Sequence, residues 1–201
     1  MLFRSRLRPN VRFHDGSPFT ADDVVFSIER VLAKTSQRAF QLRGVAAARK
    51  VDDLTIDIVL ATPDAVLPDK LIQVGMMSKA WATKNNVVLP QDYNGKQETF
   101  AVRNANGTGP YQLKSYEPDN KLVLVANPYW WGQRGNVDEA IYTVIQSDAT
   151  RIAALASGQV DFVIDPPFQD IVRLTAEKRF TLVSTTDIGT QYLGFDQSRD
   201  E

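Results

Sequence analysis

The spacing of apolar residues changes repeatedly along the chain, and this change constrains the fold more than any other feature. Every second residue from Leu54 to Leu60 is a leucine or an isoleucine, as in a strand that buries one face. Residues 24–32 instead place apolar side chains three or four positions apart, as in a helix with one buried stripe. We therefore predict an α/β fold of mixed α+β type, in which a mixed β-sheet is flanked by helices.

Capping and turn residues divide the chain into short elements. Thr20 is expected to begin a helix that ends near Ala33, because its hydroxyl can cap a free backbone N–H and the two aspartates that follow favour the positive end of a helix. Further helices are expected at residues 67–74, 78–84, 149–156 and 168–176, and strands at residues 45–51, 54–60, 111–116, 122–126, 140–145, 160–164, 180–184 and 191–195. The alternation of strands and helices after residue 140 favours a mixed or parallel sheet there.

The composition excludes several classes of function. Lys and Arg total 23 and Asp and Glu total 24, so the chain has no basic excess with which to bind nucleic acid. No apolar run approaches the roughly 20 residues that span a bilayer. Cysteine is absent and His14 is the single histidine, which excludes thiol catalysis and leaves a poor ligand set for a transition metal. We expect no metal and no cofactor.

The candidate catalytic groups each have a simpler interpretation. His14 and Asp15 form a possible acid–base dyad, but a histidine at the end of a strand before a turn is more often structural. Asp161 and Asp165 would lie about 13 Å apart on one strand, without an acid partner nearby. No catalytic constellation emerges, which favours a binding protein; a hydrolase and a protein-interaction domain remain the alternatives.

Two motifs are candidates for contact with a ligand. Residues 106–110 (NGTGP) form a glycine-rich turn whose backbone N–H groups could bind an anion, although the lysine and serine of a P-loop are missing and Pro110 lacks a donor. Trp130 and Trp131 are adjacent, so their side chains point in opposite directions and at most one lines a pocket.

Four blocks of the sequence carry a resemblance to a known family. Residues 7–27 (LRPNVRFHDGSPFTADDVVFS) resemble the signature of the peptide/nickel-type (family 5) extracellular solute-binding proteins that serve ABC importers. Three further blocks agree with that family in the same order: residues 107–111 running into 127–130, residues 153–161, and residues 192–196.

The resemblance implies a two-lobed, periplasmic-binding-protein-like receptor that closes on its solute, with this chain as a fragment of lobe I. Residues 1–107 would be the smaller subdomain, 108–195 the main sheet subdomain, and 196–201 the start of the hinge towards the second lobe. Residues 1–8 lack the apolar segment of a secretory signal, so we expect the signal or lipoprotein leader and the second lobe to lie outside this chain.

The same resemblance implies the function and the site. The protein would not be an enzyme but the substrate-binding component of an ABC importer, capturing a peptide or similar small solute for a membrane permease, in the periplasm or as a cell-surface lipoprotein. A dipeptide, a longer peptide, a metal chelate and a sugar-like compound all remain open as the solute. By analogy with the family, the wall of the cleft would include Met77, Trp81, Asn106, Gly107, Thr108, Gly109, Trp130 or Trp131, and Tyr192.

Overall fold

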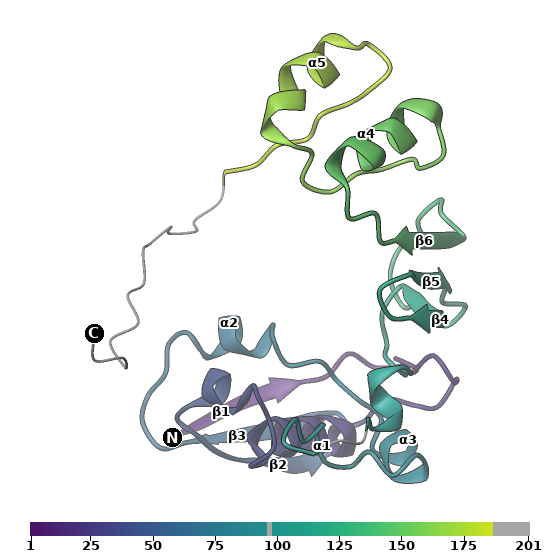
Figure 1. Cartoon of the computed structure of the whole chain (residues 1–201). Coiled ribbons are helices and arrows are strands. Elements are labelled where there is room, and N and C mark those ends of the chain that lie inside the picture. The colour runs from purple at the N-terminus through teal and green to yellow at the C-terminus, as the bar shows by residue number, and fades with distance from the viewer. Residues whose placement is uncertain (96–97, 187–201) are drawn as a thin grey trace. The chain divides into compact units, whose positions relative to one another are not determined.

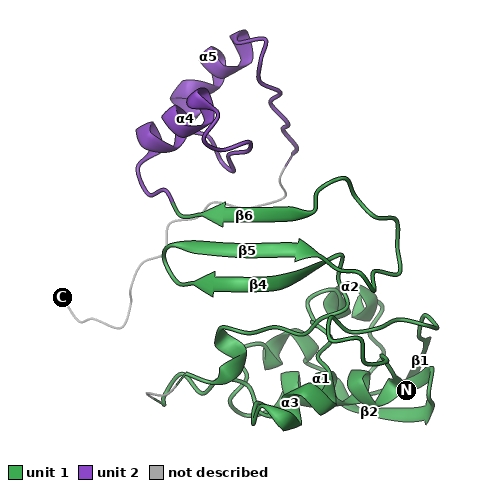
Figure 2. Cartoon of the chain, turned by 90° about the vertical axis from the view of Figure 1, so that its right-hand side faces the viewer, with its two compact units in different colours: residues 1–144 green, residues 145–201 purple. Residues whose placement is uncertain are grey.

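The structure is a computed structural model that describes residues 1–95 and 98–186. The chain divides into two compact units, residues 1–144 and 145–201 (Figure 2). The subdomain boundary expected near residue 107 falls inside the first of these units and stays a prediction.

The first sheet is antiparallel and has the strand order β1-β3-β2, with β1 at Leu2–Arg6, β2 at Val45–Asp52 and β3 at Thr55–Leu60 (Figure 1). β3 is the central strand, and Ile56, Ile58 and Leu60 are buried as the alternation predicts. Across β1 and β3 the Arg4 guanidinium donates to both carboxylate oxygens of Asp57, at 2.7 and 2.8 Å. The hairpin predicted from residues 45–60 is therefore confirmed.

Helix α1 (Ala21–Leu32) packs against β2 and β3 and forms the main core with them (Figure 1). Ala21, Val24 and Ile28 lie on its buried face, four or three residues apart, as the sequence predicts. Its first turn contains a buried aspartate: Asp23 accepts hydrogen bonds from the N–H of Thr20 (2.9 Å) and from the Thr20 hydroxyl (3.1 Å). The same carboxylate accepts from the N–H of Lys79 (2.9 Å), which joins the starts of two helices.

Short helices and a long loop complete this part of the first unit. Helix α3 (Lys79–Lys84) begins after Ser78, whose hydroxyl accepts a hydrogen bond from the N–H of Trp81 at 3.2 Å. A second, smaller core consists of Phe26 from α1 together with Ala82 and Val87. The short elements are η1 (Ala39–Leu42), α2 (Leu67–Leu71), α3 (Lys79–Lys84) and η2 (Phe100–Val102).

The second sheet is antiparallel, in the order β4-β5-β6, with β4 at Tyr111–Glu117, β5 at Lys121–Ala126 and β6 at Glu139–Thr143 (Figure 2). The strands predicted at 111–116, 122–126 and 140–145 are thus confirmed to within two residues at each end. Asn120 closes the β4–β5 turn through a hydrogen bond from its side chain to Glu117 (2.6 Å).

The second unit contains helix α4 (Asp148–Ser157), the short turn η3 (Phe168–Asp170) and helix α5 (Ile171–Ala176). Ser147 caps α4 by accepting from the N–H of Thr150 at 3.3 Å. Gly158 ends α4 with a left-handed conformation (φ 76°), which glycine adopts at little cost. Both helices agree with the predicted ranges.

The strands expected at residues 160–164 and 180–184 are wrong: neither range is a strand in the structure. Their apolar composition is typical of strands, but a strand also needs a neighbour that pairs with its backbone, and nothing in residues 1–95 or 98–186 pairs with them. All strand pairs in those residues are antiparallel, so they contain no mixed or parallel sheet after residue 140. The strand expected at 191–195 lies outside the described residues.

Candidate functional site

A tight turn at residues 13–17 provides the first half of the candidate site. The Phe13 side chain is fully buried, and backbone hydrogen bonds of 2.8 Å run from Phe13 N–H to the Ser17 carbonyl and from Gly16 N–H to the Phe13 carbonyl. The Asp15 carboxylate accepts from the Ser17 N–H (3.0 Å) and hydroxyl (2.6 Å). These hydrogen bonds within the turn fix its conformation, and they therefore hold His14 at a defined position.

His14 binds the glycine-rich segment through both its backbone and its ring. Its backbone N–H donates to the Gly107 carbonyl (2.8 Å), and the Gly107 N–H donates to its Nδ1 (3.1 Å). Because Nδ1 is an acceptor here, the proton of the neutral ring is on Nε2, which lies 3.3 Å from the Gly109 carbonyl oxygen. Both ring nitrogens are thus engaged by the segment that precedes β4.

Asn106 forms the second link between the turn and this segment. Its Oδ1 accepts from the Asp15 N–H (3.2 Å) and its Nδ2 donates to the Asp15 carboxylate (2.9 Å). Asn106 is buried, as expected for an amide whose oxygen and nitrogen both have partners. Its side chain positions the segment.

Asn127, which directly follows β5, fixes the other end of the segment. It is buried; its Nδ2 donates to the Gly109 carbonyl (2.8 Å), and its backbone N–H donates to the Pro110 carbonyl (2.8 Å). Its Oδ1 accepts from the N–H of Tyr129 (2.9 Å), and the Tyr129 ring lies against Gly16, where a Cβ atom would be only 3.2 Å from the ring. The turn, the glycine-rich segment and the residues after β5 therefore form one polar network.

The network lowers the pKa values of His14 and Asp15. Burial lowers the pKa of His14 below its ordinary value of 6.5, although the Gly109 carbonyl and the charge of Asp15 oppose the shift. Burial of Asp15 favours its neutral form, but hydrogen bonds from Ser17 and Asn106 outweigh this, so the pKa of Asp15 lies below its ordinary value. Near neutral pH the network contains a neutral imidazole beside a carboxylate.

The anchored segment also contains donors that remain unpaired. Within residues 1–95 and 98–186, nothing accepts a hydrogen bond from the N–H of Thr108, the N–H of Gly109 or the Thr108 hydroxyl. Three donors in two consecutive residues can bind an oxygen atom of a carboxylate or a carbonyl. This is the chemistry that the glycine-rich turn suggested in the sequence.

Met77 and Trp81 belong to a different group, around the smaller core. Both are partly buried against that core, and the Trp81 and Phe100 rings lie 5.7 Å apart between centroids. The backbone of Met77 is held by Ser27, whose hydroxyl accepts from the Met77 N–H at 2.9 Å.

Trp130 and Trp131 form a third group. Their ring centroids lie 4.3 Å apart at an angle of 44°, so the two rings contact each other and do not point in opposite directions as the sequence predicted. The reason is that residues 127–132 form a turn, not a strand, so side chains do not alternate there. The Arg8 guanidinium lies over the exposed Trp131 ring, 4.3 Å from its centroid.

The predicted site residues thus fall into three groups that share no direct hydrogen bond or ring contact in the described parts of the chain. Asn127 links two of them, because its carbonyl also accepts from the N–H of Trp130 (3.2 Å). Sequence reasoning missed Asn127 and Asp15 as supports of the segment. Tyr192 lies outside the described residues.

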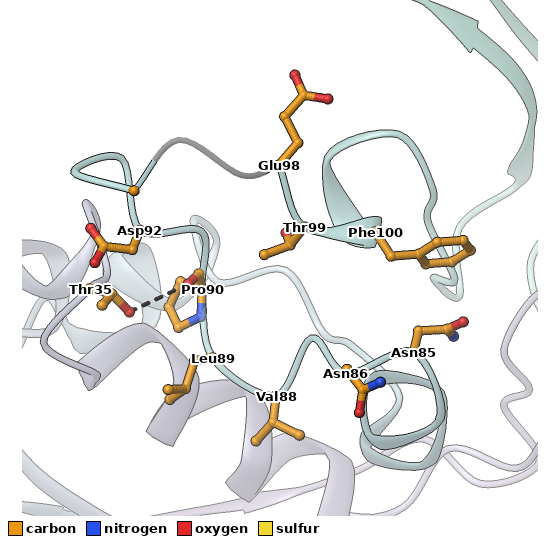
Figure 3. A pocket seen from close by; sticks show the side chains of 11 residues that line it. Thr35, Asn85, Asn86, Val88, Leu89, Pro90, Asp92, Glu98, Thr99 and Phe100 are labelled. Atoms are coloured by element: carbon orange, nitrogen blue, oxygen red, sulfur yellow. Dashed lines mark hydrogen bonds between the residues drawn. The ribbon is translucent and has the colours of Figure 1, made fainter.

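A hollow of about 940 Å³ lies beside the smaller core and was not predicted (Figure 3). Its lining combines apolar side chains, among them Val88, Leu89 and Phe100, with the polar Thr35, whose hydroxyl donates to the Pro90 carbonyl (3.4 Å). Its two carboxylates already have partners: Asp92 accepts from Asn94, and Glu98 from Arg103. The signal in the sequence is that residues 85–107 are polar and poor in periodicity, which is typical of a long loop.

Residues 1–95 and 98–186 contain no group of three or more His, Asp or Glu side chains that could hold a metal ion. In the same residues, no helix is both long and apolar enough to cross a bilayer.

Comparison with solved structures identifies the fold. An oligopeptide-binding protein, AppA, from Bacillus subtilis, solved with a nonapeptide, superposes with a TM-score of 0.74 at 24% identity, over 88% of this chain and 34% of that one. NikZ from Campylobacter jejuni, solved with Ni(L-His), gives a TM-score of 0.72 at 24% identity, over 86% and 34%. The fold is that of the periplasmic binding proteins.

Sequence comparison identifies the family. Residues 3–200 match the model of the bacterial extracellular solute-binding proteins, family 5, middle region, and the chain belongs to this family. It is 28% identical to a putative ABC transporter peptide-binding protein of Brucella ovis, over 94% of this chain and 35% of the relative. It is 27% identical to a dipeptide-binding protein of Escherichia coli, over 94% and 38%. The chain therefore spans little more than a third of these relatives, and the resemblance stated from the sequence is confirmed.

Proposed function

We propose that this protein is part of the solute-binding receptor of an ABC importer, and that it captures a peptide or a similar small solute for delivery to a membrane permease. The observation that carries the proposal is the match to the family 5 model over residues 3–200. The names of the relatives, which include peptide-binding and dipeptide-binding proteins, support a peptide as the first solute to test.

The geometry of the segment before β4 supports a role in binding. Its donors at Thr108 and Gly109, which have no partner among the described residues, suit the carbonyl and carboxylate oxygens that every peptide carries. We assign them to one wall of the binding cleft, with Met77, Trp81 and the Trp130–Trp131 pair as further apolar candidates for that wall. Asn106 and Gly107 hold the segment in place, because their polar groups bond to Asp15 and His14. Tyr192 stays a candidate from the sequence alone.

A hydrolase is less well supported. His14, the single imidazole, is engaged at both ring nitrogens by backbone groups, so it has no free nitrogen to accept a proton from a substrate or water. The family consists of binding proteins, and we propose the same for this chain, acting in the periplasm or as a cell-surface lipoprotein together with a permease.

The test begins with the protein as its gene encodes it, purified from its host without added ligand. Mass spectrometry of the small molecules released on denaturation should identify a peptide or a similar solute. Titration calorimetry with an equimolar mixture of di- to tetrapeptides should then give a dissociation constant in the micromolar range or tighter, or about −8 kcal/mol. Turnover of the peptides, or the absence of both a released solute and peptide binding, would contradict the proposal.

A further inference from the structure

His14 has two properties that no function discussed so far explains. It is the only histidine in the chain, and its ring is bonded on both sides to the segment that contains the unpaired donors. A half-buried side chain that only filled space would not need this arrangement, because an apolar residue of similar size could take its place. The protonation state of the imidazole therefore decides whether one of the hydrogen bonds that hold the segment can form.

The hydrogen bond from Gly107 to Nδ1 requires the neutral ring. When Nδ1 gains a proton it becomes a donor and faces the Gly107 N–H, which is also a donor, so this bond is lost. The bond from Nε2 to the Gly109 carbonyl can persist, because Nε2 is a donor in both states. Protonation therefore removes one of the two hydrogen bonds between His14 and Gly107, because the bond from the His14 backbone N–H to the Gly107 carbonyl (2.8 Å) does not involve the ring.

The surroundings of the ring contain few other titratable groups. Asp15 and Arg12 lie on the same turn, and Arg12 donates to the Gly16 carbonyl (2.8 Å). Residues 104–110 carry no titratable side chain, and the residues after β5 contribute the phenol of Tyr129, which packs on Gly16. Of these groups, only Asp15 carries a negative charge at neutral pH.

We infer that His14 is a positioning residue of the binding site: its neutral imidazole holds Gly107 and Gly109 so that the donors of Thr108 and Gly109 can receive a carboxylate or carbonyl oxygen of the solute. The second half of this inference, that the donors contact the solute, rests on the proposed function. Its first half, the control of the segment by the imidazole, is a property of the unliganded protein and can be tested without any ligand.

The first experiment follows the imidazole and the segment in one NMR titration of the unliganded protein. The imidazole signals of His14 are identified as those that His14→Asn lacks, and the Gly107 amide reports its hydrogen bond to that ring. We expect both to titrate with one midpoint below pH 6.5, and the Gly107 amide to be less protected from exchange, relative to its intrinsic rate at each pH, below that midpoint. A Gly107 amide that does not follow the imidazole, or a midpoint at or above pH 6.5, would overturn the inference.

The second experiment measures binding of the di- to tetrapeptide mixture by three forms of the protein. In His14→Asn the amide oxygen can replace Nδ1 as acceptor but cannot titrate, whereas in His14→Leu no acceptor is left. We expect His14→Leu to bind about tenfold more weakly than wild type at neutral pH, the loss expected for about one hydrogen bond. His14→Asn should bind within about threefold of wild type and should lose the weakening that wild type shows below its midpoint.

The outcomes separate this inference from the proposed function. Equal affinity of wild type and His14→Leu, or identical pH profiles of wild type and His14→Asn, would remove His14 from the binding site while leaving the receptor function intact. Failure of the wild-type protein to bind the mixture would instead count against the proposed function and the contact with solute, while the NMR titration would still decide whether the imidazole holds the segment.

Discussion

At the scale of single residues, Asp23 is a charged side chain that connects two helices of the first unit. It is buried, and its carboxylate accepts hydrogen bonds from the backbone of Thr20 at the start of α1 and of Lys79 at the start of α3. Asp23 therefore joins the main core to the smaller core that holds Met77 and Trp81.

Asp23→Ala should lower the free energy of unfolding by about 3 kcal/mol, because two backbone N–H groups lose a charged acceptor. Denaturation by urea, followed by circular dichroism, measures this. Thr20→Ala is the matched control: it removes only the hydroxyl that donates to the same carboxylate and should cost about 1 kcal/mol. Equal effects of the two substitutions would show that Asp23 does not link the helices.

The depressed pKa of His14 makes stability depend on pH. Since the folded protein disfavours the charged ring, the unfolded chain binds more protons between the ordinary pKa of 6.5 and the lower folded value. The stabilisation is complete above pH 6.5 and is lost as the pH falls towards the folded pKa. Urea denaturation between about pH 7.5 and about pH 5 should show this decline in wild type and not in His14→Asn. Parallel curves for the two proteins would contradict it.

Aspartates do not obscure that measurement. Hydrogen bonds from Arg4 lower the pKa of Asp57 below 3.8, and the pKa of Asp15 is lowered as well. Groups of this kind lose most of their stabilising contribution as the pH falls below about 3.8, which is below the pH range of the measurement.

At the scale of helices and strands, the sequence predicts best those elements whose partners are close along the chain. The hairpin at residues 45–60 and helix α1 follow from alternation and helical spacing, and both are present. The segments at 160–164 and 180–184 have the composition of strands but no pairing partner in the described residues, and composition does not reveal whether a partner exists.

The end of α4 provides a test at this scale. Gly158 has φ 76° and open space around it, so Gly158→Ala should cost about 1 kcal/mol through backbone strain alone. Gly75→Ala is the matched control, since Gly75 also has open space but no positive φ, and it should change stability by less than about 0.5 kcal/mol. Thermal unfolding monitored by circular dichroism compares them; a neutral Gly158→Ala would mean that the left-handed C-cap is not needed.

At the scale of the whole molecule, the sequence predicts that the glycine-rich segment contacts a ligand, but it does not predict which residues hold that segment in place. His14 and Gly107 are 93 positions apart, and no local pattern shows that they meet. The family resemblance supplied residues 106–109 as candidates, whereas the supporting roles of Asp15 and Asn127 become visible only when the turn, the segment and the end of β5 are seen together.

The limited span of the chain leads to a prediction about affinity. Residues 1–201 cover 38% of the E. coli dipeptide-binding protein, so we expect them to supply only part of the surface that encloses a solute. The isolated 201 residues should therefore bind the peptide mixture at least about tenfold more weakly than that relative, because the entropy lost on binding is similar while the contacts are fewer. Calorimetry of both proteins under identical conditions measures the difference; equal affinities would place the whole site within these residues.

The position of β1 in the first sheet sets an order of events during synthesis. β2 and β3 are joined by a tight turn and can pair as soon as both have been made, but β1 pairs with β3 across a separation of 53 residues, as in the Arg4–Asp57 contact. At a translation rate of about 5–20 residues per second, the first strand waits about 3–10 s for its partner. For that time Leu2 and Phe3 have no sheet to join, which makes this strand a segment that a ribosome-associated chaperone can hold.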